Sequence, residues 1–249
     1  MDDHRARFAA LHRKGEPLVL FNAWDAGSAR AIAEAGAAAV ATGSWSVAAA
    51  HGFADAEGLP IELALANAER IVGAVAVPVT IDFEGAYAVD PDQVAANMLR
   101  LAATGAAGCN FEDQVVGGEG LHAIALQADR IAAARSAVGS DFYINARIDL
   151  FLKAKADRHA EAMAEAMERA EAYAEAGASG LFLPGLGDPD LIGRACEDSP
   201  LPVNIMAHPG APSTEMLAGL GVARISHGPF PYRRMIAWLT EAAAEHYRG

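Results

Sequence analysis

Acidic side chains cluster just after the apolar runs that predict buried strands. Asp82 and Glu84 follow one such run, Glu112 follows the next, and Asp55 lies in a loop after an earlier one. Carboxylates that converge without a matching set of Lys or Arg repel one another, and a hard divalent cation removes that cost. Oxygen ligands suit Mg²⁺ or Mn²⁺. The spacing therefore predicts a metal site, with helix N-caps or surface acids as the alternative interpretation.

A guanidinium ends another predicted strand. Arg147 lies in the segment Asn145–Asp149, directly after an apolar run. Its planar fork suits bidentate binding of a substrate carboxylate. The alternative is an ion pair with Asp149 or Glu112 that ties the loops together, and both roles can coexist.

Two glycine-containing segments and three histidines are weaker candidates. Gly43–Ser46 offers consecutive backbone N–H groups to an anion or oxyanion. Gly117–Gly120 is expected to form a mobile loop beside Glu112 and is a candidate lid. A loop histidine is more often a solvated residue than a base, so none is assigned on position alone. The histidines closest to predicted strand ends are His122, His208 and His227.

Eight strand-then-helix units run along the chain without a break in composition. The predicted strands are Leu18–Phe21, Ala38–Thr42, Pro78–Ile81, Cys109–Phe111, Phe142–Asn145, Gly180–Leu183, Pro202–Ile205 and Ala223–Ile225. The predicted helices cover 28–35, 61–75, 91–104, 123–138, 157–176, a short stretch after 188, a stretch from 213, and 231–246. Alternating strands and helices predict a parallel sheet, and eight units predict an α/β fold that closes into a (β/α)8 TIM barrel.

We expect one domain, 1–249, with its barrel core at about 18–240. In such a barrel the active site lies where strands end and loops begin. The polar residues at those points are Asn22, Asp25, Ser44, Asp82, Glu84, Glu112, Asp113, Arg147, Asp149, Asn204 and Ser226.

Composition excludes several classes of partner. The chain has 249 residues, 53% of them hydrophobic, and a net charge of −13. A surface this acidic repels phosphate backbones and anionic lipid, so we expect neither a nucleic-acid nor a membrane partner. An anionic substrate stays possible, because a metal ion reverses the sign of the local charge. Residues 1–5 do not resemble a signal peptide, and no apolar run is long enough to span a bilayer.

The two cysteines, Cys109 and Cys196, are expected to be reduced packing residues. Together with the charge and the absence of a recognisable leader, this predicts a cytoplasmic protein.

Seven motifs together resemble the isocitrate lyase/phosphoenolpyruvate mutase superfamily. In order and spacing they span roughly residues 18–240, and the combination is specific although no single piece is. The motifs are Phe21–Ala29, Thr42–Ala48, Gly52–Asp55, Asp82–Gly85, Phe111–Gln114, Asn145–Asp149 and Leu183–Gly185.

The resemblance implies a Mg²⁺-dependent barrel enzyme. Its members cleave or form C–C or P–C bonds next to a 2-oxo or 2-hydroxy carboxylate, through an enolpyruvate-like intermediate. By position, Asp82 would bind the metal directly, and Asp55, Glu84 and Glu112 directly or through waters. Ser44 and Trp45 would present backbone N–H groups to the substrate, and Arg147 would hold a carboxylate.

The chain departs from the superfamily pattern in one loop. Isocitrate and methylisocitrate lyases carry a Lys–Lys/Arg–Cys–Gly–His loop after the Glu–Asp–Gln segment, and the phosphonate branch uses a Lys and an Asn–Ser lid there. The segment Val115–His122 has neither and is shorter. This argues against the isocitrate and methylisocitrate lyase reactions, and it disfavours the mutase and phosphonopyruvate hydrolase. It also leaves the acid/base open, with His122 or His208 as candidates.

The expected function is a Mg²⁺- or Mn²⁺-dependent lyase acting on a small 2-oxo or 2-hydroxy carboxylic acid, by oxaloacetate-type decarboxylation or retro-aldol cleavage. The alternatives are a P–C bond enzyme acting on a phosphonopyruvate-like substrate, and an inactive barrel that binds 2-oxo acids. Superfamily members often exchange a C-terminal helix, so the resemblance also implies a homo-oligomer, dimer or tetramer. The candidate residues are Arg147, Glu112 and His122 for catalysis, Ser44, Trp45, Asp55, Arg147 and Asn204 for substrate binding, and Asp82, Glu84, Glu112 and Asp55 for the metal.

Overall fold

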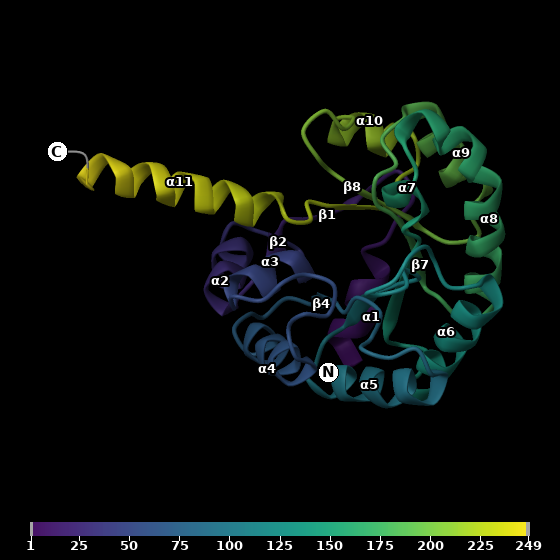
Figure 1. Ribbon diagram of the computed structural model, residues 1–249, viewed down its shortest axis with the longest axis horizontal. Helices are drawn as coiled ribbons and strands as arrows, with labels where there is room; N and C mark the ends of the chain where they lie inside the picture. Colours follow the sequence, from purple (N-terminus) through teal and green to yellow (C-terminus); the bar gives the residue numbers. More distant parts are fainter. Residues whose placement is uncertain (1, 248–249) are drawn as a thin grey trace.

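Parallel strands alternate with helices throughout the computed structural model, which describes residues 2–247 (Figure 1). The strands are β1 Leu18–Leu20, β2 Asn22–Ala23, β3 Val40–Thr42, β4 Val79–Asp82, β5 Gly108–Glu112, β6 Tyr143–Arg147, β7 Gly180–Leu183, β8 Val203–Met206 and β9 Arg224–Ser226. The helices are α1 Asp2–Ala10, α2 Ala26–Glu34, α3 Ser44–Ala50, α4 Ile61–Val72, α5 Pro91–Ala103, α6 Ile124–Val138, α7 Leu150–Lys153, α8 His159–Glu175, α9 Pro189–Asp198, α10 Thr214–Gly219 and α11 Phe230–Tyr247, with a 3-10 turn at Ala156–Arg158.

The strands form a nearly closed barrel. Their order in the sheet is β1-β9-β8-β7-β6-β5-β4-β3-β2, and every pairing is parallel. β1 pairs with β9 and β2 pairs with β3, so these two short strands, separated only by Phe21, act as the two halves of one barrel strand. The predicted (β/α)8 fold is therefore confirmed.

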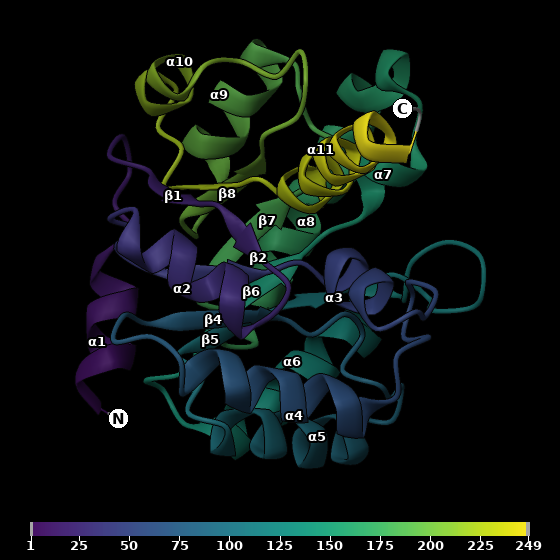
Figure 2. The ribbon, with the colours of Figure 1, turned by 90° about the vertical axis from the view of Figure 1, so that its left-hand side faces the viewer.

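Helices cover the outside of the barrel, and their apolar faces follow the predicted periodicity. In α5, Asp90 caps the N-terminus by accepting a hydrogen bond from Gln93 N, and Pro91 occupies the first turn. Val94, Met98 and Leu101 are fully buried beneath this helix. Figures 1 and 2 show α4, α5 and α6 side by side outside the strands that carry the acidic residues.

Three helices were not predicted: α1, α3 and α7. The residues of α1 are mostly polar, so the sequence shows no clear apolar face for this helix. Its Phe8 is nevertheless fully buried against Leu18 and Leu20 at the start of the barrel. In α3, Val47 and Ala48 pack against Leu59, a contact that local spacing does not reveal. Both helices form because of tertiary burial, which can override a weak local propensity.

His12 gives the fold a measurable dependence on pH. Its ring stacks on Tyr143 at 4.0 Å and its Nδ1 lies 2.9 Å from the Phe8 carbonyl oxygen, while its Nε2 is buried without a partner. Burial, together with the charge of Arg224, lowers the pKa of His12 from 6.5 to about 3. Below pH 6.5, His12 therefore binds a proton in the unfolded chain but stays neutral in the folded chain.

We expect the free energy of unfolding to fall on acidification from pH 6.5 towards 3, by at most about 1.4 kcal/mol per pH unit from this one group. His12→Phe keeps an aromatic ring against Tyr143 but has no proton to bind, so its stability should fall less steeply. Urea unfolding at several pH values between 6.5 and 4.5 measures the two slopes. Parallel slopes for the two proteins would contradict this prediction.

The last helix leaves the barrel. Figure 1 shows α11 projecting away from the body, whereas the helix after the last strand of a closed barrel ordinarily packs against the outside of that barrel. Trp238 and Leu239 on this helix are 65% and 50% exposed. Within residues 2–247, neither α11 nor any other helix is long and apolar enough to cross a membrane.

Candidate active site

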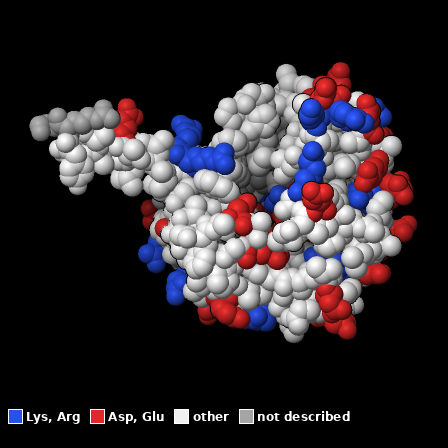
Figure 3. All heavy atoms as spheres, viewed as in Figure 1, with Lys and Arg blue, Asp and Glu red and all other residues white. Residues whose placement is uncertain are grey.

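The carboxyl ends of three neighbouring strands bring the predicted charged residues together. Asp82, Glu112 and Arg147 are the last residues of β4, β5 and β6. In the sheet register Glu112 lies opposite Arg147, and Asp82 lies opposite Asn110. Figure 3 shows acidic side chains around the hollow at the centre of this face and basic ones at the base of α11.

A cavity of about 180 Å³ opens at this rim. Its polar lining contains five of the predicted rim residues together with Asp55, Trp45, Asn110 and Arg233. The lining residues are Asn22, Gly43, Ser44, Trp45, Asp55, Asp82, Asn110, Arg147, Leu152, Phe182, Pro184, Met206, Ser226, Gly228, Pro229 and Arg233.

Asp82 is held by hydrogen bonds on both carboxylate oxygens. The Ser44 N–H and hydroxyl each donate to Asp82 Oδ2 at 2.9 Å, and Asn110 Nδ2 donates to Asp82 Oδ1 at 3.2 Å. The predicted anion-binding N–H of Ser44 is therefore already used by Asp82. These bonds fix the orientation of the carboxylate while leaving it on the surface of the cavity.

Two loops that carry acids are joined by reciprocal hydrogen bonds. The Glu57 N–H donates to Glu84 Oε2, and the Tyr87 N–H donates to Glu57 Oε1, both at 2.7 Å. The backbone φ angles of Glu57 and Glu84 are positive, 58° and 50°, a conformation that residues other than glycine rarely adopt. Such backbone strain persists only where the surroundings enforce it, and it is concentrated at functional sites.

Burial and mutual repulsion make these acids hard to ionise. Burial, with Asp82, Asp55 and Glu57 nearby, raises the pKa of Glu84 to about 8. Burial and the charge of Asp82 also raise the pKa of Asp55. Glu84 lies behind the main cavity and lines a void of about 20 Å³ that also reaches Asp82, which is room for one water molecule.

Arg147 is engaged by three carboxylates. Its Nε and Nη2 donate to the two oxygens of Asp149 at 2.6 and 2.9 Å. Its Nη1 lies 2.8 Å from Glu112 Oε2 and 3.8 Å from Asp82 Oδ1. Burial disfavours the charge of Arg147, but the three carboxylates raise its pKa well above the usual value. The predicted ion pairs with Asp149 and Glu112 are thus both present, on a side chain that also lines the cavity.

Glu112 is buried behind Arg147 and does not line the cavity. Burial raises the pKa of its carboxyl well above the usual value, and Arg147 opposes that shift.

The donor set fits a hydrated divalent cation better than a fully protein-coordinated one. Within residues 2–247, no three His, Cys, Asp or Glu side chains converge closely enough to enclose an ion. Mg²⁺ normally keeps several waters and needs only one or two carboxylates. Asp82, fixed on the cavity surface with Asp55 and Glu84 in its electrostatic neighbourhood, meets that requirement.

Several predicted residues lie away from the cavity surface. Asn204 is buried in the barrel, where its Nδ2 donates to Ser226 Oγ at 3.2 Å. His122 lies beside Asp113 and Arg169, and burial, with Arg130 and Arg169 nearby, lowers its pKa. His208 does not line the cavity either. The roles predicted for Asn204 and His122 stay predictions.

Other rim residues have structural roles. Asp25 caps α2 through Ser28, and Asn22 Oδ1 accepts hydrogen bonds from the N–H groups of His227 and Gly228. The Gly117–Gly120 segment forms a tight turn closed by a bridge between Gln114 and Leu121. The sequence analysis did not identify Asn110 or Arg233 as site residues. Asn110 could have been found as a polar residue inside an apolar strand, whereas nothing in the sequence marked Arg233.

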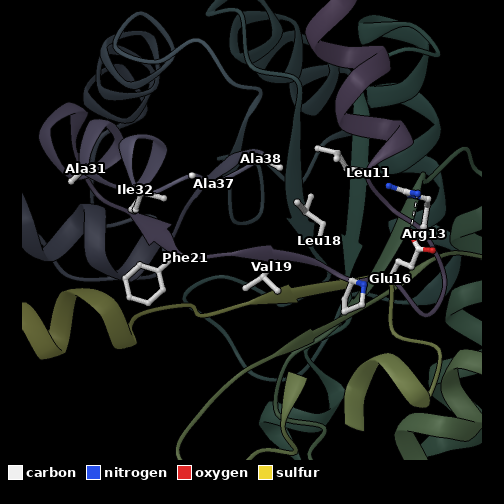
Figure 4. A pocket seen from close by; sticks show the side chains of 13 residues that line it. Leu11, Arg13, Glu16, Leu18, Val19, Phe21, Ala31, Ile32, Ala37 and Ala38 are labelled. Atoms are coloured by element: carbon white, nitrogen blue, oxygen red, sulfur yellow. Dashed lines mark ion pairs between the residues drawn. The ribbon is translucent and has the colours of Figure 1, made fainter. Parts of the chain in front are cut away.

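A larger hollow lies elsewhere. A groove of about 750 Å³ runs along the outside of β1 beside α2 and is mostly apolar (Figure 4). Its only titratable lining residues, Arg13 and Glu16, form an exposed ion pair at 2.9 Å. It therefore lacks the converging polar groups that an active site needs.

A family model described as phosphoenolpyruvate phosphomutase matches residues 8–247. The chain belongs to this family. Its predicted membership of the isocitrate lyase/phosphoenolpyruvate mutase superfamily, whose members are lyases, mutases and hydrolases that use Mg²⁺, is thereby confirmed.

Relatives within the family differ in activity. A Burkholderia cenocepacia J2315 structure provisionally assigned as a phosphonomutase is 47% identical, with a TM-score of 0.96 over 98% of this chain and 99% of that one. An uncharacterized Mycobacterium tuberculosis H37Rv protein is 36% identical over 90% of this chain and 83% of its own. The 2-methylisocitrate lyase of Escherichia coli K12 is 27% identical over 96% and 81%.

A phosphonopyruvate hydrolase in complex with oxalate and Mg²⁺ shares the fold. It is 22% identical, with a TM-score of 0.87 over 98% of this chain and 87% of that one. This likeness shows a shared barrel fold.

Proposed function

We propose that this protein is a Mg²⁺-dependent lyase that cleaves a C–C bond next to a 2-oxo or 2-hydroxy carboxylate, through an enolpyruvate-like intermediate. One observation carries the proposal. Asp82 is pinned on the cavity surface by Ser44 and Asn110, beside an arginine and among acids whose pKa values are raised. Such a site suits a hydrated cation, which can in turn hold an anionic ligand.

The residues at the cavity would have separate roles in metal binding, substrate binding and orientation. Asp82 would hold the metal, with Asp55, Glu84 and Glu112 contributing through water. Bound Mg²⁺ would supply a Lewis acid that stabilises negative charge on the oxygen next to the broken bond. Arg147 would bind the substrate carboxylate with the nitrogen that faces Glu112 and Asp82. Ser44 would act by orienting Asp82, and Trp45 would form a wall of the cavity.

Proton transfer distinguishes the two reactions that the site allows. Decarboxylation of a 2-oxo diacid needs no strong base when the bond breaks, because carbon dioxide leaves and a water can protonate the enolate. Retro-aldol cleavage needs a base for the substrate hydroxyl. The carboxylates that line the cavity are Asp55 and Asp82, so Glu112, which is buried behind Arg147, would act on the substrate only through a water or through Arg147.

A substrate panel tests the proposal. The protein is incubated with Mg²⁺ and a set of 2-oxo and 2-hydroxy acids or phosphonopyruvate, and pyruvate, carbon dioxide and phosphate are measured. Mg²⁺-dependent release of pyruvate or carbon dioxide is the expected result. Phosphate release from phosphonopyruvate would replace the lyase by a P–C bond enzyme, and tight binding without turnover would replace it by an inactive binding barrel.

We also propose a homo-oligomer in which α11 of one copy covers the groove of another. Because α11 leaves the barrel, the outer side of β1 stays open, with Val19 and Phe21 40% and 42% exposed. This is the groove of Figure 4, and a second hollow of about 520 Å³ extends it past Trp24 to Met235 at the base of α11. Two unpartnered apolar surfaces on one chain are matched most simply by exchanging the helix between copies.

Trp238→Glu should shift the protein towards the monomer, because it places a charge in the apolar contact. Light scattering coupled to size-exclusion chromatography measures the mass. Ala237→Glu adds the same charge at a neighbouring position about 100° around the helix and should leave the mass unchanged. A wild-type monomer at micromolar concentration would rule out the exchange.

A further inference from the structure

A second arginine reaches the cavity from outside the barrel strands. Arg233 lies in the first turns of α11 and lines the cavity together with Arg147. Its guanidinium carbon lies 4.4 Å from the centre of the Trp45 ring and 5.9 Å from that of Phe230. Trp45 in turn packs edge-to-face with Tyr232 at 6.0 Å. The aromatic side chains thus hold the Arg233 guanidinium at the cavity.

The two arginines differ in how their charges are balanced. Arg147 is paired with Asp149 and Glu112. Within residues 2–247, no carboxylate forms an ion pair with Arg233, and its guanidinium makes no hydrogen bond to the protein. A guanidinium stacked on an indole ring keeps its in-plane N–H donors free for an oxyanion.

The remaining wall of the cavity offers an uncharged substrate little to bind. It is formed by the side chains of Leu152, Phe182, Pro184, Met206 and Pro229. These can pack against a short carbon chain, but they neither donate nor accept strong hydrogen bonds. Asn22, Asn110 and Ser226 also line the cavity, but their side chains already form hydrogen bonds within the protein. Beyond the reacting end at Asp82 and Arg147, the cation of Arg233 is therefore the main source of selectivity in this cavity.

We propose that Arg233 binds the second anionic group of a substrate with two charges. The substrate class is then a short 2-oxo or 2-hydroxy acid with a carboxylate or phosphonate at its far end. This inference rests on the proposed function, because it places the reacting carboxylate at Arg147. It assigns selectivity for the far end of the substrate to α11. The loop Val115–His122 cannot supply that cation, because it contains no lysine.

Matched ligands test the proposal in the full-length protein with Mg²⁺. Calorimetry gives Kd for 2-hydroxysuccinate, 2-hydroxy-3-phosphonopropanoate and the singly charged 2-hydroxybutanoate. Oxalate, which has no far end, reports on the metal and Arg147 alone. The variants are Arg233→Gln, Arg233→Lys, which keeps the charge, and Arg234→Gln as the matched control, because Arg234 does not line the cavity.

The wild type should bind at least one doubly charged ligand about tenfold or more tightly than 2-hydroxybutanoate. Arg233→Gln should remove that preference and leave oxalate binding unchanged, Arg233→Lys should keep part of it, and Arg234→Gln should keep all of it. The ligand that loses more affinity identifies the far group as carboxylate or phosphonate.

The inference is overturned if the wild type shows no preference for two charges, or if Arg233→Gln keeps the preference. A loss of oxalate binding in Arg233→Gln would also overturn it, because Arg233 would then act at the reacting end. If the wild type fails to bind oxalate with Mg²⁺, the proposed function itself falls, and this inference falls with it.

Discussion

Asp82→Asn should abolish measurable Mg²⁺ binding and lower turnover by at least about a thousandfold. The amide keeps the size of the side chain and an oxygen that can accept the hydrogen bonds from Ser44. It removes the negative charge that fixes the cation, and Lewis-acid stabilisation of a developing enolate is worth several kcal/mol. Calorimetric titration with Mg²⁺ measures binding independently of activity, and steady-state assays measure turnover.

The fold should survive this change, because Asp82 is partly exposed at the rim and has no role in the apolar core. Circular dichroism and thermal melting without metal should match the wild type closely. Asp129→Asn is the control, since Asp129 is exposed on α6 away from the cavity, and it should change nothing. Normal Mg²⁺ affinity in Asp82→Asn would show that the metal site has been misplaced.

Arg147→Lys should raise the Michaelis constant by at least about tenfold. An ammonium group is a point charge that cannot reproduce the planar fork which now engages Asp149 with two nitrogens and Glu112 with the third. The substrate carboxylate would lose its charge-assisted contact to Nη1, because a lysine ammonium held by Asp149 and Glu112 does not place a donor at the same point. Affinity for oxalate, measured with Mg²⁺ present, should fall together with affinity for substrate.

Some destabilisation will accompany that variant, because the carboxylates around Arg147 are buried and keep only part of their compensation. Thermal melting separates this effect from ligand binding. Arg158→Lys makes the same chemical change at an exposed ion pair with Glu161 and should leave both readouts unaltered. An unchanged Michaelis constant in Arg147→Lys would exclude Arg147 as the carboxylate clamp.

The sequence alone determined the barrel and the rim at which the chemistry is placed. Eight apolar runs alternate with helical segments, and a parallel arrangement puts the carboxyl ends of all strands on one side. For this reason Asp82, Glu112 and Arg147 could be predicted to meet, although 30 positions separate the first two and 35 the last two. Local capping signals were equally direct, as the Asp90–Pro91 start of α5 shows.

Only the tertiary structure decided which polar groups share the cavity and how each is held. Asn110 orients Asp82 across two strands, Arg233 arrives from the last helix, and His122 is drawn towards Arg169 instead. These outcomes depend on loop paths and side-chain packing between segments remote in the chain. Periodicity encodes which face of an element is buried, but it carries no information on which distant side chain completes a hydrogen bond or a charge balance.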